Sequence, residues 1–193
     1  AGNVSAASSL SFTLDTTATD FTVSLLCDSG TAGDKVSNQG SLSLANVEPD
    51  AALQYSTNGG TTWTNTFIAT EGANTVTVRM TDVAGNERTH DLSFTLLSGK
   101  PAAPVLTLIC DSGLSASDLI TKNEAIQVVT ATGTTVLYST DATTWTSTFT
   151  PAEGSNTVYA RSVDVSGNHS DTTVLTFTLD KTVPLAVVVS LTS

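Results

Sequence analysis

Cationic side chains and long apolar runs are both scarce in this chain of 193 residues. Seven Lys and Arg stand against eighteen Asp and Glu, which gives a formal net charge of −11. Such a surface repels polyanions, so the composition argues against nucleic acid and anionic membranes as partners and favours divalent cations. The longest apolar run, residues 185–189, is far shorter than the ~20 residues that a membrane span needs. We therefore expect no membrane insertion.

Catalytic chemistry has few candidates. The only two histidines, His90 and His169, do not occupy equivalent positions in the repeats described below. No nucleophile motif, phosphate-binding loop or Cys–His metal spacing occurs. We therefore expect that the protein is not an enzyme.

Cysteine is equally rare, with only Cys27 and Cys110 present. Bridged Cα atoms lie within about 7 Å, whereas equivalent points on successive extended repeats lie tens of ångströms apart at ~3.3 Å per strand residue. A disulfide between them is therefore not expected. Each cysteine falls on the same face of its strand as the inward-facing residues before it, in the period-two alternation. We therefore expect both to be small buried hydrophobic side chains. The alternative is a disulfide bridge to another chain.

No signal peptide is visible at the start of this sequence. The start lacks the basic segment and following apolar segment of a signal peptide. We therefore expect the chain to come from the interior of a longer protein.

At 39% of the residues, the apolar share is high enough to build cores, so disorder is not expected.

An internal repeat is the strongest feature of the sequence. Its period is 83 residues and slips to 82 where Asn58-Gly59-Gly60 becomes Asp141-Ala142, in a turn that tolerates a deletion. The recurring segments are residues 27–30 with 110–113, residues 54–64 with 137–146, and residues 82–86 with 164–168. The ends carry fragments of the same pattern, because residues 10–15 match 92–97 and 175–180, and residues 189–191 match 23–25.

These matches predict the domain organisation. We expect the terminal strand of a preceding repeat (1–17), two whole repeats (18–98 and 99–182), and the first strand of a following repeat (183–193).

Each repeat has the period-two pattern of β-strands. In residues 75–81, Val76, Val78 and Met80 alternate with polar neighbours, which is typical of a half-buried strand. No helical periodicity of useful length is present. The strands expected in the first whole repeat are residues 20–27, 41–45, 52–57, 61–64, 66–69, 74–81 and 90–96. About seven short strands in ~80 residues indicate a Greek-key sandwich.

Four aromatic residues lie in strands beside tight turns: Tyr55, Trp63, Tyr138 and Trp145. We expect them to anchor the core or its edge. The alternative is an exposed aromatic platform for sugar.

The repeat resembles a known group, the bacterial immunoglobulin-like repeats of giant surface adhesins, of the type I-secreted and biofilm-associated class. The segments that carry the resemblance are residues 28–30, 33–34, 36–38, 55–63, 71–72 and 82–86, with residues 111–113, 117–121, 153–154 and 164–168 in the second repeat. The resemblance implies an all-β fold of tandem immunoglobulin-like Greek-key β-sandwiches arranged end to end. It also implies an extracellular or cell-surface rod that holds an adhesive domain away from the cell, with calcium stiffening its joints. The two cysteines depart from the family pattern, as does Leu97, which stands where Asp15 and Asp180 stand in the other two linkers.

Metal ligands can be predicted from the geometry of such a sandwich. Loops at the end of one repeat face loops at the start of the next, so carboxylates would converge and repel each other at the joints. Calcium accepts six to eight oxygens in irregular shells and suits such a joint better than magnesium. The candidate ligands are Asp15, Asp28, Asp34, Glu71, Asp82, Asp111, Asp118, Asp164 and Asp180, with Glu48 or Asp50 near the first joint. The alternative is that each Asp only bonds its own turn.

The sequence thus predicts a structural spacer of an extracellular adhesin or filament. Its partners would be neighbouring repeats of the same protein and other copies of the chain, whose end strands could pair by strand addition. The alternatives are a module that binds carbohydrate or protein, and a non-catalytic domain of a secreted hydrolase. The two repeats differ mainly in one loop, residues 45–51 against 129–134, and neither loop is rich in aromatic residues, which favours the spacer.

Overall fold

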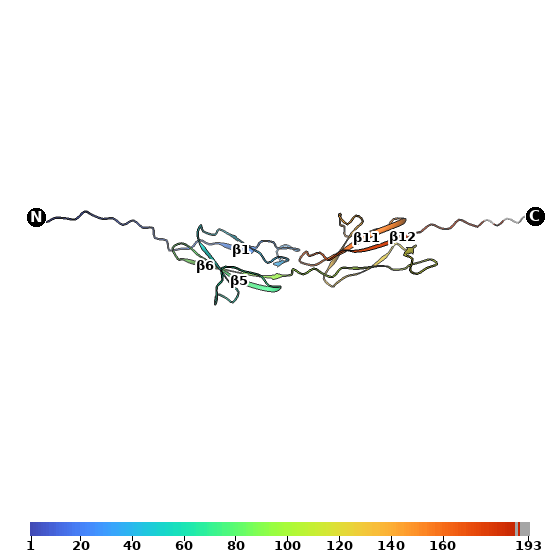
Figure 1. Cartoon of the computed structure of the whole chain (residues 1–193), viewed down its shortest axis with the longest axis horizontal. Coiled ribbons are helices and arrows are strands. Elements are labelled where there is room, and N and C mark those ends of the chain that lie inside the picture. The colour runs from blue at the N-terminus through green and yellow to red at the C-terminus, as the bar shows by residue number, and fades with distance from the viewer. Residues whose placement is uncertain (188, 190–193) are drawn as a thin grey trace, which may run out of the picture. The chain divides into compact units, whose positions relative to one another are not determined.

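Figure 1 shows the computed structural model of the chain, which describes residues 1–187 and 189. The described residues contain strands and no helix, so the prediction of an all-β chain is confirmed. The chain divides into two compact units. Unit 1 comprises Ala1–Asp28 and Ala32–Leu97, and unit 2 comprises Ser29–Thr31 and Ser98–Ser193.

Unit 1 contains a four-stranded and a two-stranded sheet. Its strands are β1 (Thr22–Leu25), β2 (Val36–Ser37), β3 (Leu42–Ala45), β4 (Ala52–Ser56), β5 (Gly72–Thr81) and β6 (Glu87–Leu96). The larger sheet has the order β2-β6-β5-β4, and β1 pairs with β3 in the smaller one. The long β5–β6 hairpin, labelled in Figure 1, is antiparallel, whereas β2 pairs parallel with β6.

The core of unit 1 lies between these two sheets. Val76, Val78 and Met80 of β5 are completely buried, and Phe94 of β6 is buried beside them. Partly buried apolar residues of β1 and β3, including Val23, pack against this cluster. The period-two alternation seen in the sequence therefore does select the inward face.

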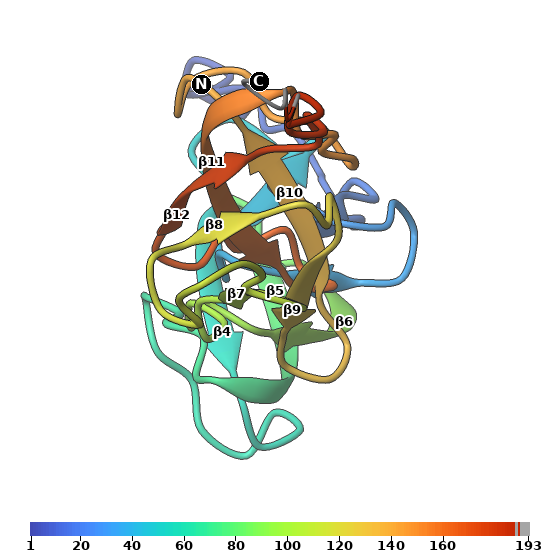
Figure 2. The same cartoon turned by 90° about the vertical axis from the view of Figure 1, so that its right-hand side faces the viewer.

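Unit 2 repeats this arrangement. Its strands are β7 (Val105–Leu108), β8 (Ile120–Thr121), β9 (Ile126–Val129), β10 (Thr135–Ser139), β11 (Gly154–Val163) and β12 (Thr173–Leu179). In Figure 2, the strands of the larger sheet, β10-β11-β12-β8, lie together, with the β7–β9 pair below them. Val158, Phe177 and Leu179 of the larger sheet are buried with Leu106 of β7, so both units have a sandwich-like core.

Two expected strands of unit 1 are absent. Residues 61–64 and 66–69 form no strand, and their only ladder contact is an isolated bridge between Tyr55 and Thr64. Local side-chain bonds take the place of a ladder there, because the Thr64 hydroxyl bonds the carbonyl oxygens of Tyr55 (3.2 Å) and Thr66 (2.8 Å). Conversely, the two-residue strand β2 was not predicted, since so short a segment shows no period.

The four aromatic residues lie at the edges of the cores. Tyr55 and Tyr138 are partly buried against the two clusters. Each tryptophan lies under an arginine of the neighbouring strand: the guanidinium carbon of Arg79 lies 4.2 Å from the ring centroid of Trp63, and that of Arg161 lies 4.0 Å from Trp145. These cation–π contacts tie the turn that follows β4 or β10 to the sheet.

The expectation of buried cysteines is wrong for Cys110. Both thiols are free, but Cys27 is only partly buried and Cys110 is exposed. The reason is that β1 ends at Leu25 and β7 ends at Leu108, so neither cysteine follows the alternation of its strand. Their carbonyl oxygens instead accept hydrogen bonds from the buried hydroxyls of Ser37 and Thr121, at 2.6 Å in each case.

The ends of the described chain form no strands. Residues 1–21 and 180–187 belong to no strand, and the apolar side chains of Leu10 and Phe12 are 86% and 77% exposed. The expected terminal strand at 183–193 lies partly outside the described residues. Among those described, we find no helix with the length and apolarity to cross a membrane.

Candidate functional site

The nine predicted metal ligands divide between the two units. Asp15, Asp28, Asp34, Glu71 and Asp82 belong to unit 1, and Asp111, Asp118, Asp164 and Asp180 belong to unit 2. Within the part of the chain that the structure describes, no three His, Cys, Asp or Glu residues form a group that could hold a metal ion.

Five of the nine accept a hydrogen bond from the backbone amide two residues further on. The donors are Thr17 N to Asp15 Oδ1 (3.1 Å), Val36 N to Asp34 (2.9 Å), Ile120 N to Asp118 (3.1 Å), Ser166 N to Asp164 (3.0 Å) and Thr182 N to Asp180 (3.0 Å). This is the local turn expected of Asp outside regular structure. Hydrogen bonds from the side chain and then the backbone of Thr182 also hold the pKa of Asp180 below its usual value.

Asp28 and Asp111 each close the loop that follows the first strand of their unit. Oδ2 of Asp28 accepts from Gly33 N at 2.7 Å, and Oδ2 of Asp111 accepts from Leu119 N at 3.1 Å. The other oxygen of Asp111, Oδ1, is buried and has no hydrogen-bond partner among the described residues. A buried acceptor of this kind is costly unless a donor or a cation meets it.

Asp82 and Asp164 brace the two long hairpins. Oδ1 of Asp82 accepts from Asn86 N and Oδ2 from Asn86 Nδ2, both at 2.8 Å. Asp164 accepts from the same two atoms of Asn168, at 2.9 and 3.0 Å. Nδ2 of Asn86 also donates to the backbone carbonyl oxygen of Asp15 at 3.3 Å, which brings the backbone of Asp15 to the hairpin of Asp82.

These bonds favour the ionised form of Asp82. The hydrogen bond from the Asn86 side chain lowers the pKa of Asp82 from its ordinary value of 3.8, with smaller effects from the backbone amides of residues 84–86. A carboxyl group whose pKa is lower in the folded state than in the unfolded state stabilises the folded state at pH values above its unfolded-state pKa. Its contribution is lost as the pH falls through the folded-state pKa.

We therefore expect Asp82→Asn to flatten the acid limb of the stability profile of unit 1. The wild-type chain should lose stability as the pH falls below about 4, because protonation breaks the bonds to Asn86. The variant lacks the titrating group and should lose less over the same range. Urea unfolding at a series of pH values measures this. Asn86→Ala keeps the carboxyl of Asp82 but removes the side chain that donates to it, so this variant should also lose less stability at acid pH. If both variants lose as much stability at acid pH as the wild-type chain, the bonds between Asp82 and Asn86 are not the cause.

Glu71 is exposed and directly precedes β5. Its counterpart in unit 2, Glu153, accepts from Lys181 N at 3.1 Å, and Lys181 also pairs with Glu124 at 2.7 Å. Glu153 lies in a segment that carries the family resemblance, but it was not among the predicted ligands, although it is the repeat equivalent of Glu71. Glu124 and Lys181 were not predicted to belong to a site.

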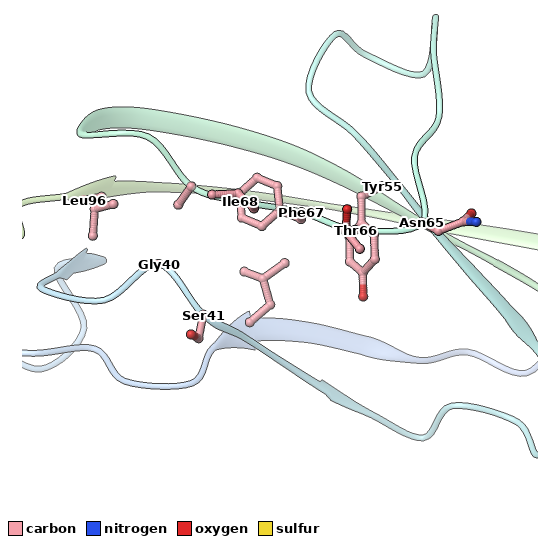
Figure 3. A pocket seen from close by; sticks show the side chains of 10 residues that line it. Gly40, Ser41, Tyr55, Asn65, Thr66, Phe67, Ile68 and Leu96 are labelled. Carbon is pink, nitrogen blue, oxygen red and sulfur yellow. The ribbon is translucent and has the colours of Figure 1, made fainter.

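Unit 1 also contains a hollow of about 520 Å³. Figure 3 shows it between Gly40–Ser41, just before β3, and residues 65–68, with Tyr55 and Phe67 side by side. The two rings are stacked, with centroids 6.4 Å apart. The hollow lies along the segment in which the predicted strand 66–69 does not form, and Ile68 at its rim is 85% exposed.

No protein-family model and no curated protein matches this chain.

Proposed function

We propose that the chain is a structural spacer: tandem immunoglobulin-like Greek-key β-sandwiches arranged end to end in an extracellular adhesin or filament. The observation that carries the proposal is the equivalence of the two units. The sheet order β2-β6-β5-β4 of unit 1 recurs as β8-β12-β11-β10 in unit 2, and the pair β1-β3 recurs as β7-β9. A spacer needs interchangeable modules, because its length comes from their number.

The equivalence extends to side chains outside the cores. The Arg79–Trp63 contact recurs as Arg161–Trp145, and the Asp82–Asn86 brace recurs as Asp164–Asn168. These contacts hold the turns in place, and the polar groups of each turn bond to other groups of the same unit. A binding module would instead present one divergent surface with polar groups left for a ligand.

The hollow of unit 1 supports a second candidate, a module that binds carbohydrate or protein. Its aromatic lining, Tyr55 and Phe67, and its polar rim of Ser41 and Asn65 are features of ligand sites. Both aromatic residues also pack against the core of the unit, which accounts for them without a ligand.

Small-angle X-ray scattering of the chain tests the spacer arrangement. End-to-end units give a maximum dimension close to the sum of their two lengths, whereas a compact particle of two units side by side contradicts the proposal. The second candidate, a binding module, is tested by titrating the chain with glycans while the NMR signals of Tyr55 and Phe67 are monitored. Shifts confined to these residues would favour binding over spacing.

Calcium forms part of the proposal because of Asp111. Its buried Oδ1 atom lacks a partner among the described residues, and Asp118 lies in the same loop. These two carboxylates could provide ligands, with backbone carbonyls and water completing a shell that calcium tolerates. Asp28 and Asp34 occupy the equivalent loop of unit 1. Calcium bound there would stiffen these loops and, in the proposed end-to-end arrangement, the joints between repeats.

We expect calcium to raise the midpoint of thermal unfolding, because an ion that binds only the folded state stabilises it by mass action. At a calcium concentration of about 100 times the dissociation constant, the gain is ~2.7 kcal/mol per site. Calorimetry with calcium and then with chelator measures the shift.

Asp111→Ala should abolish the part of the shift that belongs to unit 2. Asp171→Ala removes the same charge from an exposed position paired with Lys100, and should leave the shift intact. Identical midpoints with calcium and with chelator would remove the metal from the proposal while leaving the spacer arrangement to the scattering test.

A further inference from the structure

The turn after β4 differs from its counterpart after β10 in one chemically important way. Unit 1 has Asn58-Gly59-Gly60, where unit 2 has Asp141-Ala142. The two units therefore carry a side-chain amide (Asn58) and a carboxylate (Asp141) at equivalent positions. An asparagine that is followed by glycine can be converted into a carboxylate without an enzyme.

The side chain of Asn58 lies at the centre of its turn. Its Oδ1 atom accepts hydrogen bonds from Ser56 Oγ at 2.8 Å and Thr62 N at 3.0 Å, and its Nδ2 atom donates to Thr62 Oγ1 at 2.8 Å. The Ser56 hydroxyl is buried and also accepts from Gly60 N at 2.8 Å.

Asp141 has the same role in unit 2. Its Oδ1 atom accepts from Ser139 Oγ (2.8 Å), Thr143 N (2.8 Å) and Thr144 N (2.7 Å). The hydrogen bonds from the backbone amides of Thr144 and then Thr143 hold the pKa of Asp141 well below its usual range. A carboxylate is thus fully accommodated at this position of the fold.

The backbone nitrogen of Gly59 is exposed and unshielded, so it can act as a nucleophile. Both Asn58 and Gly59 are exposed, and a Cβ atom built on Gly59 would meet nothing within 4 Å. No hydrogen bond within the described part of the chain engages the Gly59 amide. Glycine has no side chain to shield this nitrogen, and its backbone moves more freely than that of any other residue.

We propose that Asn58 is a site of spontaneous modification. The backbone nitrogen of Gly59 attacks Cγ of Asn58, forming a new C–N bond. The bond from Cγ to Nδ2 breaks, and Nδ2 leaves as ammonia with the proton that Gly59 N gives up. Water then opens the resulting succinimide at one of its two carbonyls, giving either Asp or isoaspartate at position 58.

The two products differ in their consequences. Asp at position 58 can reproduce the contacts of Asp141 and adds one negative charge to a chain that is already acidic. Isoaspartate inserts an extra carbon into the backbone and shifts Gly60 N from the buried hydroxyl of Ser56. The modification therefore yields one product that keeps the turn and one that disrupts it.

Ageing of the full chain tests the proposal. The protein is incubated in mildly alkaline buffer at body temperature, digested and analysed by mass spectrometry, with Asn58→Asp as the standard for one product. Because glycine leaves its amide unshielded, the peptide with Asn58 should deamidate at least about tenfold faster than those with Asn65, Asn86 or Asn156. Isoaspartate should form beside Asp.

Gly59→Ala is the matched control, since it retains Asn58 but restricts and shields the nitrogen. Its fold is expected to survive, because Ala142 has a φ of 60° at the equivalent turn and Gly59 has 66°. Circular dichroism confirms folding before the ageing experiment. Deamidation of Asn58 should slow about tenfold in this variant. Equal rates in the two proteins, or an Asn58 that stays intact while another asparagine deamidates, would overturn the proposal.

Discussion

Replacing Phe94 by Ala should lower the free energy of unfolding of unit 1 by about 3–5 kcal/mol, the range for large aromatic residues removed from a core. Phe94 is 4% exposed in β6 and packs edge-on against Phe67, with 6.3 Å between ring centroids. Its removal leaves a cavity between the two sheets that their paired backbones cannot close. Urea unfolding followed by amide hydrogen exchange in β5 and β11 separates the effect on unit 1 from that on unit 2.

Phe12→Ala is a matched control for this change. Residues 10–14 have the same alternation of Leu, Phe and Leu as residues 92–96, but Phe12 is 77% exposed and belongs to no strand. Its replacement should change stability by no more than about 0.5 kcal/mol, as for surface positions in general. If Phe94→Ala costs no more than Phe12→Ala, then the core of unit 1 is not the one described.

The same pair of phenylalanines shows how far sequence patterns reach. Alternation correctly predicted β5, β6 and the buried residues on them, because burial on one face of a sheet has a period of two. The identical pattern at residues 10–14, expected as the terminal strand of a preceding repeat, forms no strand among the described residues. A strand needs a partner with unpaired backbone groups, and the pattern itself contains no information about a partner.

The sequence did not reveal two kinds of feature: short strands whose partners are distant in the chain, and a segment whose polar groups bond within their own turn. β2 and β8 are two residues long and pair in parallel with β6 and β12, so they have no period of their own. Residues 61–69 have the composition of strands, but their polar groups are used by side chains of the same turn, notably Asn58 and Thr64.

The candidate site shows a similar limit. The carboxylates of Asp28, Asp82 and Asp111 were identified from recurring turns, but recurrence does not distinguish a metal ligand from a brace. Eight of the nine candidates accept a hydrogen bond from a backbone amide. Among the described residues, Asp111 alone of the nine has a buried carboxylate oxygen without a hydrogen-bond partner, and only coordinates reveal that difference.

Asn156→Ala should destabilise unit 2 by about 3 kcal/mol, because it removes three hydrogen bonds worth ~1 kcal/mol each. Oδ1 of Asn156 accepts from Ala152 N at 2.9 Å, and Nδ2 donates to the carbonyl oxygens of Ala152 (2.8 Å) and Gly154 (2.9 Å). The side chain is buried, so water cannot replace these bonds without opening the loop. Urea unfolding with hydrogen exchange in β11 measures the loss.

The neighbouring variant Ser155→Ala should leave stability within about 0.5 kcal/mol, since Ser155 is exposed on the same strand. Asn74→Ala in unit 1 provides an independent repeat of the experiment, because Asn74 makes the equivalent bonds to Thr70 and Gly72. A similar loss in both units would show that one asparagine, in place of a strand ladder, fixes the loop that leads into the long hairpin. A loss in neither would mean that the cores alone hold these loops, and that the segment before β5 or β11 is free to rearrange.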